Sequence, residues 1–320
     1  MAETDPVGAA GNWERTIIEK LARAALDEQR RARHWGIFFK TLTFIYLFIL
    51  MFAAFGWLGG REVAMTGNHS ALVELNGVIA ADAYANADAI NQGLQDAFAD
   101  KSTKGVILRI NSPGGSPVQA GTINTEIGRL REKYPDIPIY AVIEDICASG
   151  GYYVAVAADQ IYVDKASIVG SIGVLMDGFG FTGTMEKLGV ERRLLTAGEN
   201  KGFLDPFSPL DPSQREYAKR MLGEIHQQFV EVVRKGRGKR LKEAPDVFSG
   251  LVWTGQKSID LGLTDAFGSV DFVAREIIKA EEIVDFTPRE NVAERLAKKF
   301  GAAMGESLAR FGVSGGIQLR

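Results

Sequence analysis

The chain has 320 residues, of which 46% are apolar and 24% are charged, and its net charge is −3. This composition is ordinary for a folded protein, and the charge balance gives no reason to expect nucleic acid as a partner. The single cysteine excludes an intrachain disulfide framework, and without a CxxC, HExxH or histidine-rich motif neither a metal nor another cofactor is expected.

Residues 1–40 are predicted to be a separate amino-terminal segment with mixed charges. Ile17, Leu21, Ala24 and Ala25 are spaced to form an apolar stripe along one face of a helix. Such a helix fits a membrane surface or a partner helix, and it equally fits a solvated tail.

Residues 41–60 contain no charged side chain and are rich in Phe, Leu, Ile and Met. About twenty apolar residues are enough to cross the hydrocarbon core of a bilayer, so this stretch predicts a transmembrane anchor. A buried core helix is the alternative, and a cleaved signal peptide is disfavoured because the forty preceding residues are too long for its amino-terminal region. The positive-inside rule predicts a cytoplasmic amino terminus and an external position for 61–320. The basic residues that decide this are Arg30, Arg31, Arg33 and Lys40 before the stretch, against Arg61 after it.

The rest of the chain alternates strand and helix patterns, which favours βα units and an α/β domain. This domain is predicted at 61–280, followed by a helical tail at 281–320. Strands are expected at 71–79, 106–110, 139–143, 160–163 and 192–196, and helices at 83–100, 117–133, 149–158, 212–234 and 292–311.

Ser149 follows an apolar strand and opens a glycine-rich turn into a helix. The free N–H groups and the dipole at a helix amino terminus favour developing negative charge, so the N–H of Gly150 can serve an oxyanion. The segment 111–115 ends another strand, and the N–H of Gly115 is the expected second donor. Each glycine pair by itself is also typical of an ordinary βα turn.

A serine nucleophile needs a base, and none of the three histidines is well placed for Ser149. His34 precedes the apolar stretch and His69 follows it closely. His226 lies in a helix between glutamines and is expected at the surface. Lys201 is therefore the better candidate for the base.

A lysine acts as a base only where its environment favours the neutral amine. Burial among Phe203, Leu204 and Phe207 would have that effect on Lys201. Ser171 is a candidate to hydrogen-bond the amine and orient it, although a plain turn serine would show the same sequence.

Two other motifs are weaker. Cys147 is a rival nucleophile, but with no histidine to accompany it a packed thiol is the simpler interpretation. The segment 178–183 matches GxGxxG without a clean strand before it, and we interpret it as a glycine-rich surface loop.

Taken together, these motifs resemble the signal peptide peptidase A family of membrane-bound Ser/Lys proteases. The resemblance covers about residues 70–275, and the chain length is similar to that of the short form with one domain per chain. The matching segments are 111–115, 148–153, 170–174 and 197–201, with 253–255 and 261–265 similar to the family's carboxyl-terminal signature.

The resemblance implies Ser149 as nucleophile, Lys201 as general base, Ser171 as the lysine's helper, and Gly115 and Gly150 as the oxyanion hole. It implies an α/β fold of the Clp-protease/crotonase type, preceded by one transmembrane helix. It also implies a homo-oligomeric ring or dome in the bacterial inner membrane, with a periplasmic catalytic domain that cleaves signal peptide remnants and other unfolded or apolar peptides.

Two other classes remain open at this point. A crotonase-like acyl-CoA enzyme would share the oxyanion glycines, and a membrane quality-control scaffold would need no catalysis. A further hypothesis concerns the loop at 198–209: rich in Gly, Pro and Phe, it could carry Lys201 across a subunit boundary to Ser149 of a neighbouring chain.

Overall fold

The structure is a computed structural model that describes residues 7–58 and 67–288 of the chain. The chain divides into two units. One consists of 1–64 together with 289–320, and the other is Met65–Pro288. The helix expected at 292–311 lies outside the described residues.

The first unit contains one long helix, α1 (Val7–Leu58). The apolar stripe and residues 41–58 of the uncharged stretch therefore belong to a single continuous helix. Its segment Ile17–Met51 is long and apolar enough to cross a membrane, and none of it is buried. Within the uncharged stretch, the hydroxyls of Thr41 and Thr43 donate to carbonyls one turn earlier, so they carry no unsatisfied donor into an apolar environment.

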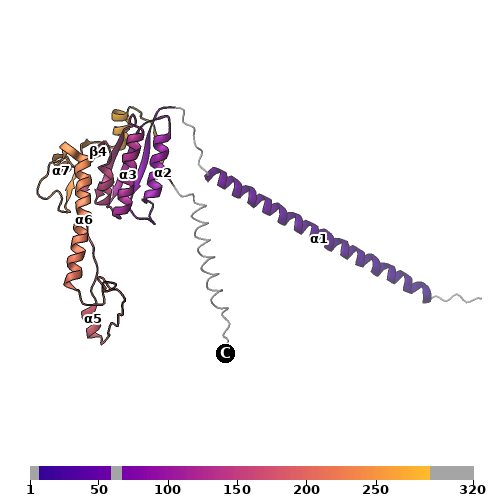
Figure 1. The fold of residues 1–320 in the computed structure, drawn as a ribbon. Coiled ribbons are helices and arrows are strands. Elements are labelled where there is room, and N and C mark those ends of the chain that lie inside the picture. The colour runs from indigo at the N-terminus through magenta and orange to yellow at the C-terminus, as the bar shows by residue number, and fades with distance from the viewer. Residues whose placement is uncertain (1–6, 59–66, 289–320) are drawn as a thin grey trace, which may run out of the picture. The chain divides into compact units, whose positions relative to one another are not determined.

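The second unit is built on a mainly parallel sheet (Figure 1), whose central strands β1, β2 and β3 are buried. The order is β6-β5-β3-β2-β1-β8, and β4 continues from β3 to β7. Only β6 runs antiparallel to its neighbour among the described pairs. The strands are β1 (His69–Asn76), β2 (Thr103–Ser112), β3 (Ile139–Ala148), β4 (Gln160–Val163), β5 (Ile168–Gly170), β6 (Val252–Thr254), β7 (Ala266–Phe267) and β8 (Ile283–Asp285).

Helices cover both faces of this sheet, which explains why β2 and β3 read as apolar runs rather than as alternating patterns. The larger core lies under α2, α3, α4 and α6, and a smaller one lies under α8 and η2. The helices are α2 (Ala87–Ala99), α3 (Pro117–Lys133), α4 (Gly150–Ala155), α5 (Thr182–Lys187), α6 (Pro212–Arg237), η1 (Gly238–Arg240), α7 (Gly255–Asp260), α8 (Val270–Phe272) and η2 (Val273–Ile278).

Local capping signals set the helix starts. Asn86 accepts the N–H of Ala89 at 2.8 Å, so α2 begins four residues after the expected start. Ser116 and Asp211 cap α3 and α6, each followed by a proline at the first helical position. Both helices begin where the sequence predicted.

The predicted α/β fold, with an apolar helix before it, is confirmed. The strand expected at 192–196 is wrong, because no strand forms there in the described chain. Leu195 is 95% exposed, and the segment lies away from the sheet, so it has no neighbouring strand with which to form a ladder.

Candidate active site

Ser149 occupies a sharp turn between β3 and α4. Its φ of 50° is unusual for a residue with a side chain. Its N–H donates to the carbonyl of Gly170 at 2.8 Å, and its carbonyl accepts the N–H of Tyr153 at 2.9 Å. Its hydroxyl caps no N–H of the helix. The turn thus holds the Ser149 side chain at the carboxyl edge of the sheet, where α/β proteins commonly bind ligands.

The segment that contains Gly114 and Gly115 lies against this turn. A Cβ on Gly114 would lie 2.7 Å from the Gly150 nitrogen, and a Cβ on Gly150 would lie 3.2 Å from the Gly115 nitrogen. Ile79 holds the segment from the other side, donating to the Gly114 carbonyl at 2.9 Å. Only glycine fits at Gly114, since its φ is +103° and any side chain would strike the Ser149 turn.

The two amides expected to bind an oxyanion are free for that task. In the described part of the chain, neither the N–H of Gly115 nor that of Gly150 donates to another group. Gly150 follows Ser149 at the start of α4, and Gly115 lies on the segment that packs against this turn. The site therefore places two backbone N–H donors beside one serine hydroxyl.

Ser171 joins the same site from β5. It follows Gly170, which accepts the N–H of Ser149, and its own N–H donates to the carbonyl of Leu251 at 2.8 Å. Its φ is 51°, and only four described residues other than glycine have a positive φ. Backbone strain of this kind concentrates at functional sites. Here it affects Ser149 and Ser171, which follow the paired strand ends Ala148 and Gly170.

Lys201 lies elsewhere, in a turn that is bound to the start of α6. The neighbouring Leu204 N–H donates to Gln214 Oε1 at 2.9 Å, and the rings of Phe203 and Tyr217 meet edge-on at 5.7 Å. Lys201 itself is exposed. The burial expected for its amine does not exist within one chain, so that expectation is wrong for the isolated subunit.

The helix α6 separates Lys201 from the nucleophile. His226, further along α6, contacts the carbonyl of Ile172, beside Ser171, through Nε2 at 3.2 Å. Gln214 and His226 are twelve residues apart, which is about 18 Å along a helix. The structure therefore brings together Ser149, Ser171, Gly115 and Gly150 but leaves Lys201 remote from them.

The remote region is residues 173–211, which we call the projecting segment. It lies with α5 at the end of α6 that is away from the sheet (Figure 1). Many large apolar side chains are exposed on it, and exposed apolar patches of this kind mark contact surfaces. They include Leu175, Phe179, Leu188, Leu195 and Leu210.

His226 was expected at the surface, and the structure corrects this. The ring is half-buried and bonded to the Ile172 carbonyl. Its spacing from the buried residues Val230 and Val233 places it on the buried face of α6. That spacing was the signal in the sequence that could have identified it.

A groove of about 590 Å³ runs beside the site, between α3 and α6. Pro117 and Val118 line it immediately after the Gly115 segment, and Tyr153 lines it one turn beyond Ser149. The groove therefore has lining residues close in the chain to Gly115 and to Ser149.

Cys147 is not a rival to Ser149. Burial raises the pKa of its thiol far above the ordinary range, so the nucleophilic thiolate is not populated. The described residues contain no cluster of three or more His, Cys, Asp or Glu side chains that could hold a metal ion.

Residues 131–284 match peptidase family S49. This matched part of the second unit is an S49 peptidase domain, similar to signal peptide peptidase A. A putative signal peptide peptidase SppA from Enterococcus faecium is 30% identical, over 59% of this chain and 54% of its own length. A putative protease from Methanocaldococcus jannaschii is 32% identical, over 62% of this chain and 64% of its own.

A Brucella melitensis protein named Na(+)/H(+) antiporter NhaA is 46% identical over 177 residues, which are 55% of this chain and 24% of that protein. The chain thus spans less than two thirds of each of these relatives. A solved structure, the S97A mutant of the 1510-N membrane-bound stomatin-specific protease, is 12% identical with a TM-score of 0.43, covering 70% of this chain and 100% of its own.

Proposed function

We propose that this S49 domain is a membrane-anchored serine endopeptidase in which Ser149 is the nucleophile and Lys201 the general base. The observation that carries the proposal is the Ser149 turn, where a strained serine lies beside the free N–H groups of Gly115 and Gly150. An acyl-transfer site needs this combination of a hydroxyl and two donors for the oxyanion.

In the proposed reaction, Ser149 Oγ attacks the peptide carbonyl while its proton passes to the neutral amine of Lys201. The carbonyl oxygen becomes an oxyanion, which accepts hydrogen bonds from Gly115 and Gly150. When the C–N bond breaks, the protonated lysine returns the proton to the leaving amine. Water then hydrolyses the acyl-enzyme with Lys201 again acting as base, and Ser171 orients that amine.

Lys201 is supplied, in this proposal, by a neighbouring copy of the chain. Within one subunit, Gln214 beside the Lys201 turn and His226 beside the Ser171 segment are about 18 Å apart along α6. A lysine side chain reaches only about 6 Å. The exposed apolar side chains of the projecting segment would be covered by the neighbour. Burial there would also favour the neutral amine that catalysis needs.

The proposed substrates are peptides with apolar side chains, including signal peptide remnants. The groove beside the Gly115 segment has apolar surface from Val118 and Ile225. The helix α1 would anchor the domain to the bilayer in which such remnants accumulate, with the amino terminus in the cytoplasm and the domain in the periplasm.

A serine-reactive phosphonate tests the nucleophile. We expect labelling of the full-length chain in detergent at Ser149, located by mass spectrometry, and loss of both labelling and peptide hydrolysis in Ser149→Ala. A matched control is Ser167→Ala, which removes the hydroxyl of another buried serine, one that precedes β5 and donates to the Glu144 carbonyl. Hydrolysis that persists in Ser149→Ala would refute the proposal, and absence of labelling in the wild type would favour a crotonase-like enzyme or a scaffold.

A further inference from the structure

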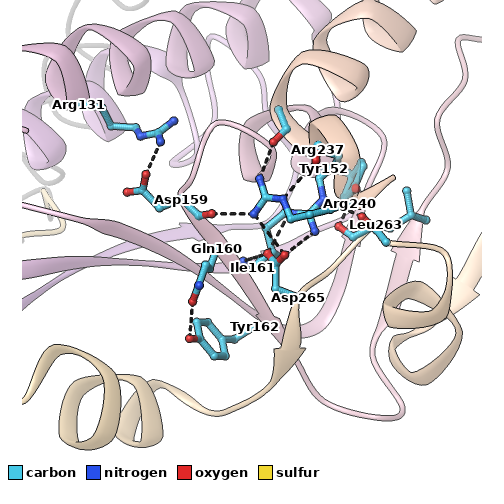
Figure 2. A network of polar contacts seen from close by, with 12 residues as sticks. Arg131, Tyr152, Asp159, Gln160, Ile161, Tyr162, Arg237, Arg240, Leu263 and Asp265 are labelled. Carbon is cyan, nitrogen blue, oxygen red and sulfur yellow. Dashed lines mark hydrogen bonds and ion pairs between the residues drawn. The ribbon is translucent and has the colours of Figure 1, made fainter. Parts of the chain in front are cut away.

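A network of polar contacts surrounds Asp265 (Figure 2). Asp265 accepts two hydrogen bonds from Arg237, at 2.7 and 2.9 Å, and one from Arg240 at 3.2 Å. It also accepts the N–H of Ile161 at 2.7 Å, at the start of β4. One carboxylate therefore joins α6, η1 and β4.

The Arg237–Asp265 pair at the centre of this network is mostly buried, so its polar atoms need hydrogen-bond partners. The Arg237 side chain is 1% exposed. Burial acts to raise the pKa of Asp265, but the bonds and charge of Arg237 outweigh it and lower that pKa below its ordinary value. The guanidinium also donates from Nε to the carbonyl of Gly262 at 2.8 Å. The segment 262–265 is consequently held at both ends.

Tyr152 reaches the middle of this segment. Its hydroxyl donates to the carbonyl of Leu263 at 2.7 Å, and its side chain is fully buried. Burial raises the pKa of the hydroxyl far above its ordinary range, so it stays protonated and keeps donating. Figure 2 shows Tyr152 and Leu263 beside Arg237 and Asp265.

Tyr152 is also the third residue after Ser149. The helix α4 has only six residues and is too short to be stable by its own hydrogen bonds, so its orientation depends on what its side chains contact. A strained turn such as that of Ser149 persists only where contacts with the surrounding structure hold it in place. The bond from Ser149 to Gly170 holds the turn on one side, and the bond from Tyr152 to Leu263 holds the helix from the side of the core.

We propose that Tyr152 is a positioning residue for the nucleophile. Its hydroxyl, held by the segment 262–265, fixes the first turn of α4 so that Ser149 Oγ and the N–H of Gly150 face the same substrate carbonyl. This role rests on the proposed function of Ser149. Arg237 on α6 is bound to the same segment. The segment 262–265 therefore contacts both α4, which follows the nucleophile, and α6, which begins where the projecting segment ends.

The test compares Tyr152→Phe with Tyr162→Phe in the full-length chain in detergent micelles. Tyr162 is a matched control, because it is 4% exposed and its hydroxyl is bonded to Gln160 at 2.7 Å, in the core of the opposite sheet face. Each change removes one bonded hydroxyl from a buried ring. The measurements are the thermal midpoint, the rate of phosphonate labelling at Ser149, and kcat and KM for a peptide substrate.

We expect Tyr152→Phe to lower the labelling rate and kcat by about tenfold, with KM within about twofold, because small misplacements of reacting groups cost that much or more. Tyr162→Phe should stay within about twofold of wild type in both rates. If Tyr152→Phe does not fold, Arg240→Gln loosens the same carboxylate from a half-exposed position and should slow labelling about threefold.

Two results would overturn the inference. One is wild-type labelling of Tyr152→Phe, or of Arg240→Gln where that variant replaces it; the other is an equal loss in Tyr162→Phe. In both cases Ser149 remains the labelled nucleophile, so only the positioning role fails. If the wild-type chain is not labelled at Ser149, the proposed function fails first and the inference fails with it.

Discussion

Co-expression of two inactive variants tests whether the catalytic site is shared between subunits. Ser149→Ala and Lys201→Ala should each abolish hydrolysis, since the two residues act as a unit. In a ring, each boundary would pair the serine of one chain with the lysine of the next. With random mixing, about a quarter of the boundaries would combine an intact serine with an intact lysine, so about a quarter of wild-type activity should return.

The assay uses a different affinity tag on each variant, and tandem purification isolates oligomers that contain both. Peptide hydrolysis is then measured per subunit. The control mixes Ser149→Ala with the double variant Ser149→Ala/Lys201→Ala, in which no boundary has an intact serine. A tandem-purified mixture that is no more active than this control would refute the shared site, and Lys201 would then have to reach Ser149 within its own chain.

Further outcomes follow from the same geometry. If Lys201 is the base, the rate should rise as pH increases through the mildly alkaline range, and Lys201→Arg should be inactive because guanidinium stays protonated; a steady fall from pH 6 to 9 would argue against this. Val118→Glu, in the groove, should raise KM for apolar peptides about tenfold with little change in kcat, and an unchanged KM would exclude the groove as a peptide site. The pKa of Asp265 is lower in the folded protein than its ordinary value of 3.8, so its ionised carboxylate stabilises the fold above pH 3.8, and this stabilisation is lost as the pH falls through the folded-state pKa. Asp265→Asn should remove that part of the acid dependence of stability, measured by thermal unfolding from pH 2 to 6. In spheroplasts of an expressing bacterium, added protease should digest 61–320 and spare the first forty residues, whereas protection of the domain would reverse the predicted orientation.

Short-range signals in the sequence determined much of this fold. Helix α3 begins at Pro117 because Ser116 before it and the proline itself form a local start signal. The turn at Ser149 was evident for the same reason, since an apolar strand, a serine and two glycines follow one another directly. The apolar stretch in α1 was predictable from composition, because the length of an uncharged stretch is a property of the chain itself, whereas the continuity of the helix from Val7 to Leu58 was not predicted.

The tertiary structure alone decided how distant segments meet. Gly115 lies beside Gly150 because β2 and β3 are paired in the sheet, a contact between segments more than thirty residues apart. The position of Lys201 depends on bonds between its loop and the start of α6, so its remoteness from Ser149 could not be read from residue spacing. The same holds for Tyr152 and Leu263, which are 111 residues apart: a hydroxyl's partner is determined by packing, and packing depends on all the elements of the domain at once.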